Sequence, residues 1–293
     1  MSVWAAVARQ IGELTGEPFA PAPPQSLGGG CINAAARLSD GDRRFFVKVN
    51  AADRLDMFEA ERDGLDELAS AEAIRVPIAI AVGSDRAQSW LILEDIDFGR
   101  PGTGSARRAG RALAALHRHT APAFGWRRDN TIGATLQPND WTDTWTDFWR
   151  EHRLGFQLRL AADRGHGGRL QHLGERLLMR FDTLIDHAPP ASLLHGDLWG
   201  GNIGYAPDGE PVIYDPAVYY GDREADVAMT ELFGGFGSDF YAAYREAWPL
   251  DAGYAVRRTL YNLYHVLNHL NLFGGGYGAQ AEEMMQRLLA EIG

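Results

Sequence analysis

The stretch LLHGDLWGGNIG, residues 193–204, constrains this chain more than any other part of its sequence. An apolar run ends there in a glycine-flanked loop that carries Asp197 and, five positions later, Asn202. A second apolar run, PVIYDPA, ends at Asp215. An Asp and an Asn in a turn usually serve only the local backbone. The rest of the sequence must therefore decide whether these residues carry chemistry.

Composition indicates a globular protein and excludes several classes. The chain has 293 residues with 45% hydrophobic content, enough for one large core or two modest ones. A net charge of -11 without a basic block argues against a nucleic-acid partner. Apolar stretches stop short of a membrane span and the N-terminus lacks a secretory pattern, so we expect a cytoplasmic protein with no membrane contact. A single cysteine, Cys31, excludes an internal disulfide and fits a reducing compartment.

The first hundred residues begin with a helix and continue mainly with strands. Helical periodicity covers residues 3–14, and a proline-rich connector follows at 18–25. Residues 31–38 and 43–50 are strand-like and flank SDGD, in which Asp-Gly predicts a hairpin.

A second helix and a second strand pair follow. Residues 53–71 predict a helix with Asp53 as its N-cap and with Met57, Leu65 and Leu68 among its buried positions. The strand-like segments 77–83 and 89–96 come next along the chain.

The character of the sequence changes after the Gly- and Pro-rich segment 97–105. Long helical patterns then dominate, interrupted by the strand-like segments 191–197 and 211–216. We therefore predict an α+β fold of two lobes: a small antiparallel-sheet lobe at residues 1–97 and a larger, mainly helical lobe at 98–293, joined near 94–99.

Two features of the predicted sheet lobe are suited to binding a nucleotide. Consecutive glycines in LGGGCIN, residues 27–33, let backbone amides approach phosphate oxygens, although a flexible turn has the same composition. Lys48 is a lone cation in an apolar strand, and a buried ammonium requires a carboxylate. Glu61 on the following helix is the candidate partner. The alternative is an edge position with the ammonium group in solvent.

The loop within residues 193–204 matches a kinase pattern when it is considered together with these features. In kinase-type phosphoryl transfer an Asp orients the attacking hydroxyl and an Asn in the same loop holds magnesium, in the pattern H-R-D-x-x-x-x-N. Asp197 and Asn202 have that spacing, and Asp215 stands where the metal-binding Asp of that class ends a strand. Lys48, Glu61 and these three residues in this order favour a phosphotransferase over capped turns.

Motifs along nearly the whole chain resemble the fructosamine kinase (ketosamine 3-kinase) family. They are GGGCIN, FVKVN, MFEAERDGL, FGWRRDNTIG, LLHGDLWGGNIGY, DPAVYYGDREADVAMTELFGGF and LYNLYHVLNHLNLFGGGY. The resemblance implies a protein-kinase-like bilobal fold related to aminoglycoside phosphotransferases, with ATP in the cleft. It implies phosphorylation of the 3-hydroxyl of ketosamines (ribulosamine, erythrulosamine or fructosamine adducts), free or on a glycated protein. Because the product releases the amine, the activity amounts to protein deglycation.

The resemblance also assigns roles to residues. It makes Asp197 the catalytic base, and Asn202 and Asp215 the ligands of Mg2+. ATP would contact one set of residues, through backbone or side chain: Gly28, Gly29, Gly30, Cys31, Ile32, Asn33, Lys48, Glu61, Glu94, Asp95 and Ile96. The chain departs from the family at ATLQPN, where Thr-Pro-Gln is more usual, and at Asp222, where many members have His. These departures bear on substrate preference.

Several aromatic and ionisable residues allow two interpretations. Trp141, Trp145 and Trp149 recur every four residues after PND, which predicts a capped helix with an apolar stripe for packing. Trp199 lies inside the catalytic loop, where it forms a wall of the sugar pocket or simply packs. His265 and His269 have a metal-compatible spacing, but core leucines surround them in the sequence and no third ligand is evident.

Asp226 is a further residue with two interpretations. The resemblance implies that it braces the backbone of the catalytic loop. Its place in READVAM, at the expected start of a helix, is also that of an ordinary acid near a helix N-terminus.

Two function classes remain. The favoured one is a small-molecule kinase acting on ketosamines, with an aminoglycoside- or choline-type phosphotransferase as the alternative among enzymes. The other class is a redox-responsive nucleotide-binding protein of low turnover. Cys31 follows three glycines, where oriented amides would favour a thiolate, and the family resemblance implies an intermolecular disulfide there. The expected state is therefore a monomer or a homodimer linked through Cys31 under oxidation.

Overall fold

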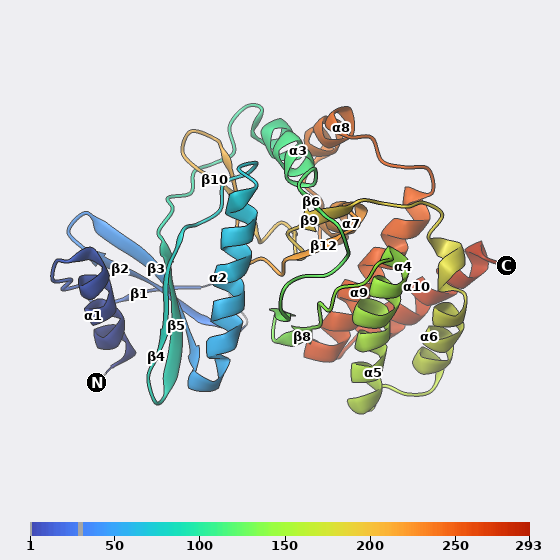
Figure 1. Ribbon diagram of the computed structural model, residues 1–293, viewed down its shortest axis with the longest axis horizontal. Helices are drawn as coiled ribbons and strands as arrows, with labels where there is room; N and C mark the ends of the chain where they lie inside the picture. Colours follow the sequence, from blue (N-terminus) through green and yellow to red (C-terminus); the bar gives the residue numbers. More distant parts are fainter. Residues whose placement is uncertain (1, 29–31) are drawn as a thin grey trace.

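The computed structural model describes residues 2–28 and 32–293 and shows a sheet flanked by helices beside a larger helical part (Figure 1). We call the part up to residue 97 the N-lobe and the part from 98 the C-lobe; this boundary remains a prediction. Within the described residues, no helix is long and apolar enough to cross a membrane.

The N-lobe is built on one five-stranded antiparallel sheet of order β1-β2-β3-β5-β4. Asp40 pairs with Arg43 across a two-residue turn in which Gly41 has φ +61°, so the predicted Asp-Gly hairpin is confirmed. The N-lobe elements are α1 (Val3–Thr15), β1 (Gln25–Leu27), β2 (Ala34–Asp40), β3 (Arg43–Ala51), η1 (Ala52–Arg54), α2 (Leu55–Ser70), β4 (Ala79–Ser84) and β5 (Gln88–Glu94).

The start of α2 differs from the sequence prediction. Asp53 is not its N-cap, because residues 52–54 form a separate 3-10 turn and the helix begins at Leu55. Arg54 occupies the cap position without a side-chain hydrogen bond. The predicted buried positions Met57, Leu65 and Leu68 are confirmed.

Helices cover both faces of the sheet (Figure 1). On one face, Leu38, Val47 and Ile92 pack in a cluster with residues of α1. On the other face, Leu91 and Leu93 pack toward α2, and their cluster continues into the C-lobe. Since α2 lies between the sheet and the C-lobe, it contacts both.

The C-lobe contains helices and short strand pairs. Its central strands form a three-stranded sheet of order β12-β9-β6, and β10 pairs with β11. The elements are α3 (Ser105–Leu116), β6 (Thr120–Ala121), β7 (Asn130–Ile132), β8 (Thr135–Gln137), α4 (Trp145–Phe148), the π-helix η2 (Trp149–Gly155), α5 (Phe156–Asp163), α6 (Arg169–Met179), η3 (Phe181–Leu184), β9 (Ala191–Leu194), β10 (Ile203–Tyr205), β11 (Pro211–Ile213), β12 (Tyr219–Gly221), α7 (Glu224–Leu232), α8 (Ser238–Ala247), α9 (Tyr254–Phe273) and α10 (Tyr277–Glu291).

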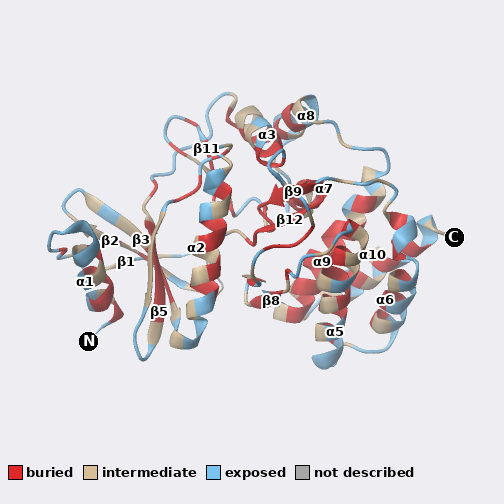
Figure 2. Ribbon diagram, viewed as in Figure 1, coloured by how far each residue is buried: buried red, intermediate tan, exposed pale blue. Residues whose placement is uncertain are grey.

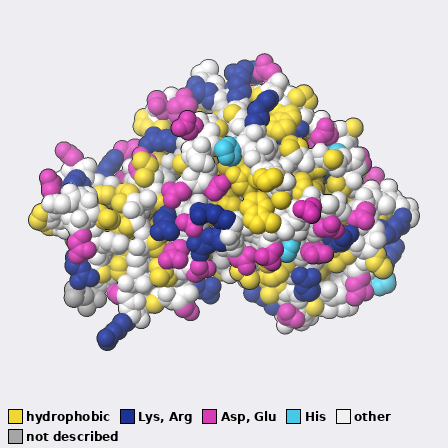
Figure 3. Space-filling model, in the orientation of Figure 1, with side chains coloured by type: hydrophobic (Ala, Val, Ile, Leu, Met, Phe, Trp, Pro, Cys, Tyr) yellow, Lys and Arg dark blue, Asp and Glu magenta, His cyan; other side chains and the backbone are white. Residues whose placement is uncertain are grey.

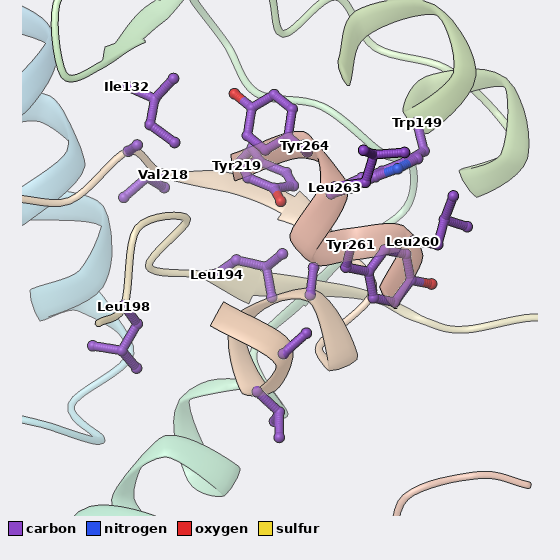
Figure 4. Packing of buried hydrophobic residues seen from close by; sticks show 14 of the residues in the cluster. Ile132, Trp149, Leu194, Leu198, Val218, Tyr219, Leu260, Tyr261, Leu263 and Tyr264 are labelled. Carbon is purple, nitrogen blue, oxygen red and sulfur yellow. The ribbon is translucent and has the colours of Figure 1, made fainter. Parts of the chain in front are cut away.

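Helix α9 lies in the densest packing of the C-lobe, where buried residues gather (Figure 2). Tyr261 and Tyr264 approach Trp149, with ring centroids 4.9 and 5.5 Å apart (Figure 4). Trp145 and Trp149 are buried as predicted, but Trp141 is 47% exposed. The predicted helix start after PND is wrong, because Thr144 caps α4 at Trp145 and leaves Trp141 outside the helix.

One apolar cluster joins α2 to the C-lobe core, so we expect the two lobes to unfold together. Leu68→Ala should destabilise the whole chain by about 2–5 kcal/mol, because the fully buried Leu68 would leave a cavity. The measurement is urea unfolding followed by tryptophan fluorescence and by circular dichroism. Leu14→Ala is the control, since Leu14 on α1 is 56% exposed and should change the stability by less than about 0.5 kcal/mol. Two separate transitions, with only one shifted by Leu68→Ala, would contradict this expectation.

Candidate active site

The loop that follows β9 is held from below by Asp226 on α7. Its Oδ2 accepts a hydrogen bond from the His195 amide at 2.7 Å, and its Oδ1 accepts one from the Gly196 amide at 2.9 Å. His117, from the end of α3, contacts the same carboxylate through Nε2 at 3.2 Å. The predicted bracing by Asp226 is therefore confirmed, and Asp226 also lies in the first turn of α7.

Burial and hydrogen bonding act in opposite directions on the Asp226 carboxyl. Burial raises the pKa of this carboxyl. The hydrogen bond and charge of His117, together with the hydrogen bond from the Gly196 amide, outweigh burial and lower the pKa. The carboxylate is thus kept ionised where it can accept the loop amides.

Gly196 brings the loop into close contact with the segment between β11 and β12, which carries Asp215. It has φ +82°, and a Cβ there would lie 1.9 Å from the carbonyl oxygen of Ala217. The Ala217 amide in turn donates to the carbonyl of His195 at 2.8 Å. Only glycine combines this backbone conformation with this close approach.

Asn202 connects the two aspartates of the site. Its Nδ2 donates to the Asp197 carbonyl at 2.8 Å and to Asp197 Oδ2 at 3.3 Å, and it lies 3.5 Å from the Asp215 carbonyl. Burial and the negative charge of Asp215 raise the pKa of Asp197 to about 7. The structure thus brings together the three residues predicted from the loop and strand motifs.

Lys48 bridges two carboxylates above this loop. Its Nζ lies 2.5 Å from Glu61 Oε1 and 2.7 Å from Asp215 Oδ1. Lys48 is 6% exposed, so the alternative of an edge lysine in solvent is wrong and its pairing with Glu61 is confirmed. Burial lowers the pKa of Lys48, but the charges of Asp215 and Glu61 outweigh it and raise the pKa. Asp215 itself has φ +59°, a strained conformation for a non-glycine residue.

The glycine-rich segment is described only in part. Gly29, Gly30 and Cys31 lie outside the described residues, and so do the predictions made for them. Next to them, Asn50 on β3 donates through Nδ2 to Asn33 Oδ1 at 2.6 Å and to the Ile32 carbonyl at 3.3 Å. A Cβ added at Gly28 would have no atom of the described residues within 4 Å, apart from its chain neighbours.

The predicted adenine-binding segment has engaged side chains. Glu94 pairs with Arg75 at 2.5 Å, and Asp95 is bonded by Arg37 Nε at 2.9 Å. Ile96 is buried against the β10–β11 hairpin. The side chains of this segment are thus held within the protein, and the Glu94 amide donates to the Ile78 carbonyl at 2.9 Å.

Trp199 is half-exposed at the edge of the site. It is 40% exposed, and its ring meets Phe233 edge to face at 6.3 Å. Phe233 also packs on His269, with centroids 4.9 Å apart. Trp199 therefore belongs to an aromatic group next to the loop and is not a core residue.

Histidines do not form a metal centre on α9 in the part of the chain that the structure describes. His269 Nδ1 bonds the His265 carbonyl at 2.8 Å. A different group, His187, Asp222 and Glu224, has ligand atoms within 4.8 Å of one another. Its carboxylates are already bonded, however, because the guanidinium of Arg257 contacts both oxygens of Glu224.

Asp222, which is buried, pairs with the partly buried His187. Their Oδ2 and Nε2 atoms are 2.8 Å apart, and Tyr261 donates to the same oxygen. Burial lowers the pKa of His187, but the hydrogen bond and charge of Asp222 outweigh it and leave the pKa raised. Asp222 Oδ1 also accepts a hydrogen bond from the Glu224 amide at 3.0 Å, so the position singled out as a departure from the family caps the start of α7.

A set of buried side-chain amides that support the segment between β11 and β12 was not predicted from the sequence. Asn130 donates to the Val218 carbonyl at 2.8 Å, and Gln137 donates to the Ala217 carbonyl at 3.0 Å. Both come from the β7–β8 hairpin, some eighty residues earlier in the chain. The signal in the sequence was one amide side chain in each of the short segments NTI and TLQ, which form that hairpin.

Gly196→Ala should destabilise the protein by about 2–5 kcal/mol and abolish most activity. The added methyl group would push the catalytic loop away from the Ala217 carbonyl and so from the segment that carries Asp215. Thermal unfolding and turnover measure the two effects. Gly165→Ala is the matched control, because Gly165 has φ +87° but none of the described atoms that surround it would lie within 4 Å of the added methyl group. Only backbone strain of about 1–2 kcal/mol is therefore expected, and activity should remain. Full activity of Gly196→Ala would contradict the close contact.

The fold and site together define a protein-kinase-like phosphotransferase: a five-stranded antiparallel sheet with a Lys–Glu pair faces a helical lobe whose loop carries Asp-x4-Asn. Comparison with known proteins narrows this class. The chain belongs to the fructosamine kinase family, whose sequence model matches residues 3–291. The resemblance noted in the sequence is thereby confirmed, and the use of ATP follows from this family of kinases.

Two relatives illustrate the similarity. A Synechocystis sp. protein named "Probable ketoamine kinase" is 50% identical over 287 residues, covering 98% of this chain and 97% of that protein. The chloroplastic protein-ribulosamine 3-kinase of Arabidopsis thaliana is 44% identical over 268 residues, covering 90% of this chain and 82% of that protein.

Solved structures agree with this assignment. A crystal structure provisionally named fructosamine-3-kinase, from Haemophilus somnus 129PT, matches with a TM-score of 0.90 and 31% identity over 98% of this chain and 97% of that chain. An aminoglycoside phosphotransferase in complex with ADP and hygromycin B matches with a TM-score of 0.67 and 15% identity, covering 97% and 98% of the two chains. At that identity the second likeness shows the shared fold alone, so the aminoglycoside- or choline-type alternative is not favoured.

Proposed function

We propose that this protein transfers the γ-phosphoryl group of ATP to the 3-hydroxyl of a ketosamine and so contributes to deglycation. One observation carries the proposal, a continuous series of hydrogen bonds through five residues. Lys48 donates to Glu61 and to Asp215, and Asn202 donates to Asp197 and to the Asp215 carbonyl. These five residues come from both lobes and have the types and order that phosphoryl transfer requires. Family membership supports a ketosamine as the acceptor.

Asp197 is proposed to orient the acceptor hydroxyl and take its proton. It directly follows His195 and Gly196, whose amides Asp226 holds in place, so its carboxylate has a defined position. Such positioning is the main contribution that a protein makes to phosphoryl transfer.

Asn202 and Asp215 are proposed to hold Mg2+. Their side chains offer an amide oxygen and a carboxylate, the hard oxygen donors that this ion prefers. The Asp215 side chain is 48% exposed. Bound magnesium would neutralise charge on the phosphates. Lys48, oriented by Glu61, would hold the α- and β-phosphates.

Other parts of the nucleotide and the sugar have proposed contacts as well. The backbone of residues 28–33 would cover the phosphates, and the backbone of 94–96 would meet the adenine edge. Trp199 would form one wall of the sugar pocket, since its exposed ring lies two residues after Asp197. An aromatic face packs well on the apolar side of a sugar.

The experiment is a coupled assay of ADP release with ribulosamine, erythrulosamine and fructosamine derivatives, beside choline and an aminoglycoside. Ketosamines should be turned over and phosphorylated on O3, as phosphorus NMR can establish. Asp197→Asn should keep its affinity for ATP but lose about a hundredfold or more in kcat, because the amide cannot accept the proton.

Asp239→Asn on the exposed face of α8 is the control and should behave as the parent chain. Turnover of choline or the aminoglycoside in place of ketosamines would reject the proposed substrate class. Full activity of Asp197→Asn would reject the proposed base.

Asp215→Ala should weaken the binding of Mg-ATP by about tenfold or more, because it removes a proposed magnesium ligand and one partner of Lys48. Calorimetric titration with and without Mg2+ measures this affinity. Asp208→Ala, in the exposed turn between β10 and β11, provides the matched comparison. Equal Mg-ATP affinity for Asp215→Ala and the parent chain would exclude Asp215 as a ligand.

A further inference from the structure

Helix α2 carries charged side chains on two opposite sides. Glu61 reaches toward the sheet and Lys48. Asp56, Asp63 and Glu67 are spaced by seven and four residues, which places them along one stripe on the other side of the helix. The stripe faces the C-lobe, as its bonds show.

Arg128, in the loop before β7, holds the first two carboxylates of this stripe. Its Nη1 donates to Asp63 Oδ2 at 2.8 Å, and its Nη2 donates to Asp56 Oδ1 at 2.5 Å. Asp63 is 9% exposed. Burial raises the pKa of Asp63, but the hydrogen bonds of Arg128 and Arg62 outweigh burial and lower it. Figure 3 shows basic side chains flanked by acidic ones over this seam between α2 and the C-lobe.

Tyr220, on β12, holds the third carboxylate. Its hydroxyl donates to Glu67 Oε1 at 2.7 Å, and Trp126 Nε1 lies 3.5 Å from the other oxygen. Close contact continues toward the site, because a Cβ at Gly64 would lie 3.2 Å from Val218 Cγ2. The segment that begins at Asp215 therefore also contacts α2.

Both partners of α2 are themselves fixed in the C-lobe. The Arg128 carbonyl accepts a hydrogen bond from Asn139 Nδ2 at 3.1 Å. Every residue from 217 to 230 is buried, so the segment that carries Tyr220 has no exposed loop that could swing. In protein kinases, activation-loop phosphorylation controls the placement of the corresponding helix and its glutamate. Here static contacts occupy that place.

We propose that Arg128 and Tyr220 are positioning residues that fix α2 to the C-lobe and thereby hold Glu61 where it pairs with Lys48. This inference rests on the proposed function, in which that pair binds the phosphates of ATP. Within the part of the chain that the structure describes, the side-chain hydrogen bonds of both residues go to α2, so each acts on the site through this helix. The Lys48–Glu61 bond is then the joint between the sheet and a rigid unit made of α2 and the C-lobe.

The test is a double-mutant cycle between Arg128→Gln and Glu61→Gln, with Mg-ATP affinity and the kinetic constants as readouts. In the parent chain, Arg128→Gln should weaken Mg-ATP binding and raise the KM for ATP by about tenfold, with little change in the KM for the ketosamine. In the Glu61→Gln chain it should change them by less than about twofold, because the pair that it positions is already lost.

Matched variants separate positioning from general stability. Arg150→Gln removes an arginine that is likewise shared by two carboxylates, Asp147 and Asp182, but far from α2 in the fold; Mg-ATP affinity should be unchanged. Tyr220→Phe is a milder change, useful if Arg128→Gln folds poorly, and should weaken Mg-ATP binding in the same background-dependent way. Glu67→Gln keeps an acceptor oxygen and should retain the affinity that Glu67→Ala loses.

Equal effects of Arg128→Gln and Tyr220→Phe in both backgrounds, or no effect in either, would overturn the inference. Nucleotide affinity is measured without a sugar, so it tests this inference even if no ketosamine is phosphorylated. Failure of the proposed substrate and failure of the positioning role are thus distinguishable.

Discussion

The ammonium group of Lys48 is the point on which the site depends. It is buried and bonded to two carboxylates, Glu61 from α2 and Asp215 from the segment between β11 and β12. An unpaired charge in such a place costs several kcal/mol, so the three chain segments cannot shift independently without a large penalty. The sheet, α2 and the C-lobe are therefore joined by electrostatics at the position where the phosphates are expected.

The C-lobe keeps its side of this junction rigid with buried polar groups. Asp226 accepts hydrogen bonds from two amides of the catalytic loop. Asn130 and Gln137 donate to the Val218 and Ala217 carbonyls, just before β12. Buried backbone groups need such partners, and fully satisfied networks define one arrangement. The carboxylate of Asp197 can then be aimed without help from a bound ligand, which is the preorganisation that electrostatic catalysis requires.

Local rules predicted much of this structure, and long-range contacts account for what they missed. The Asp-Gly hairpin follows from turn chemistry, and the partner of Lys48 follows from the cost of burying a charge. The predicted N-cap at Asp53 was wrong because a 3-10 turn precedes the helix. The prediction that Trp141 belongs to the helix was wrong because the four-residue spacing begins before the helix does. The bonds of Arg128 to α2 join residues 65 and 72 positions apart, a pairing that no periodicity or spacing reveals.

The pair of His187 and Asp222 has a consequence for how relatives of this chain can vary. The partly buried imidazole bonds the buried carboxylate, and Tyr261 bonds the same carboxylate oxygen. A histidine at position 222, as the family resemblance implies for many members, would face a second imidazole unless position 187 also changed. Since two imidazoles cannot form the same charged pair, we expect substitutions at these two positions to covary, with an acceptor replacing His187 where histidine replaces Asp222.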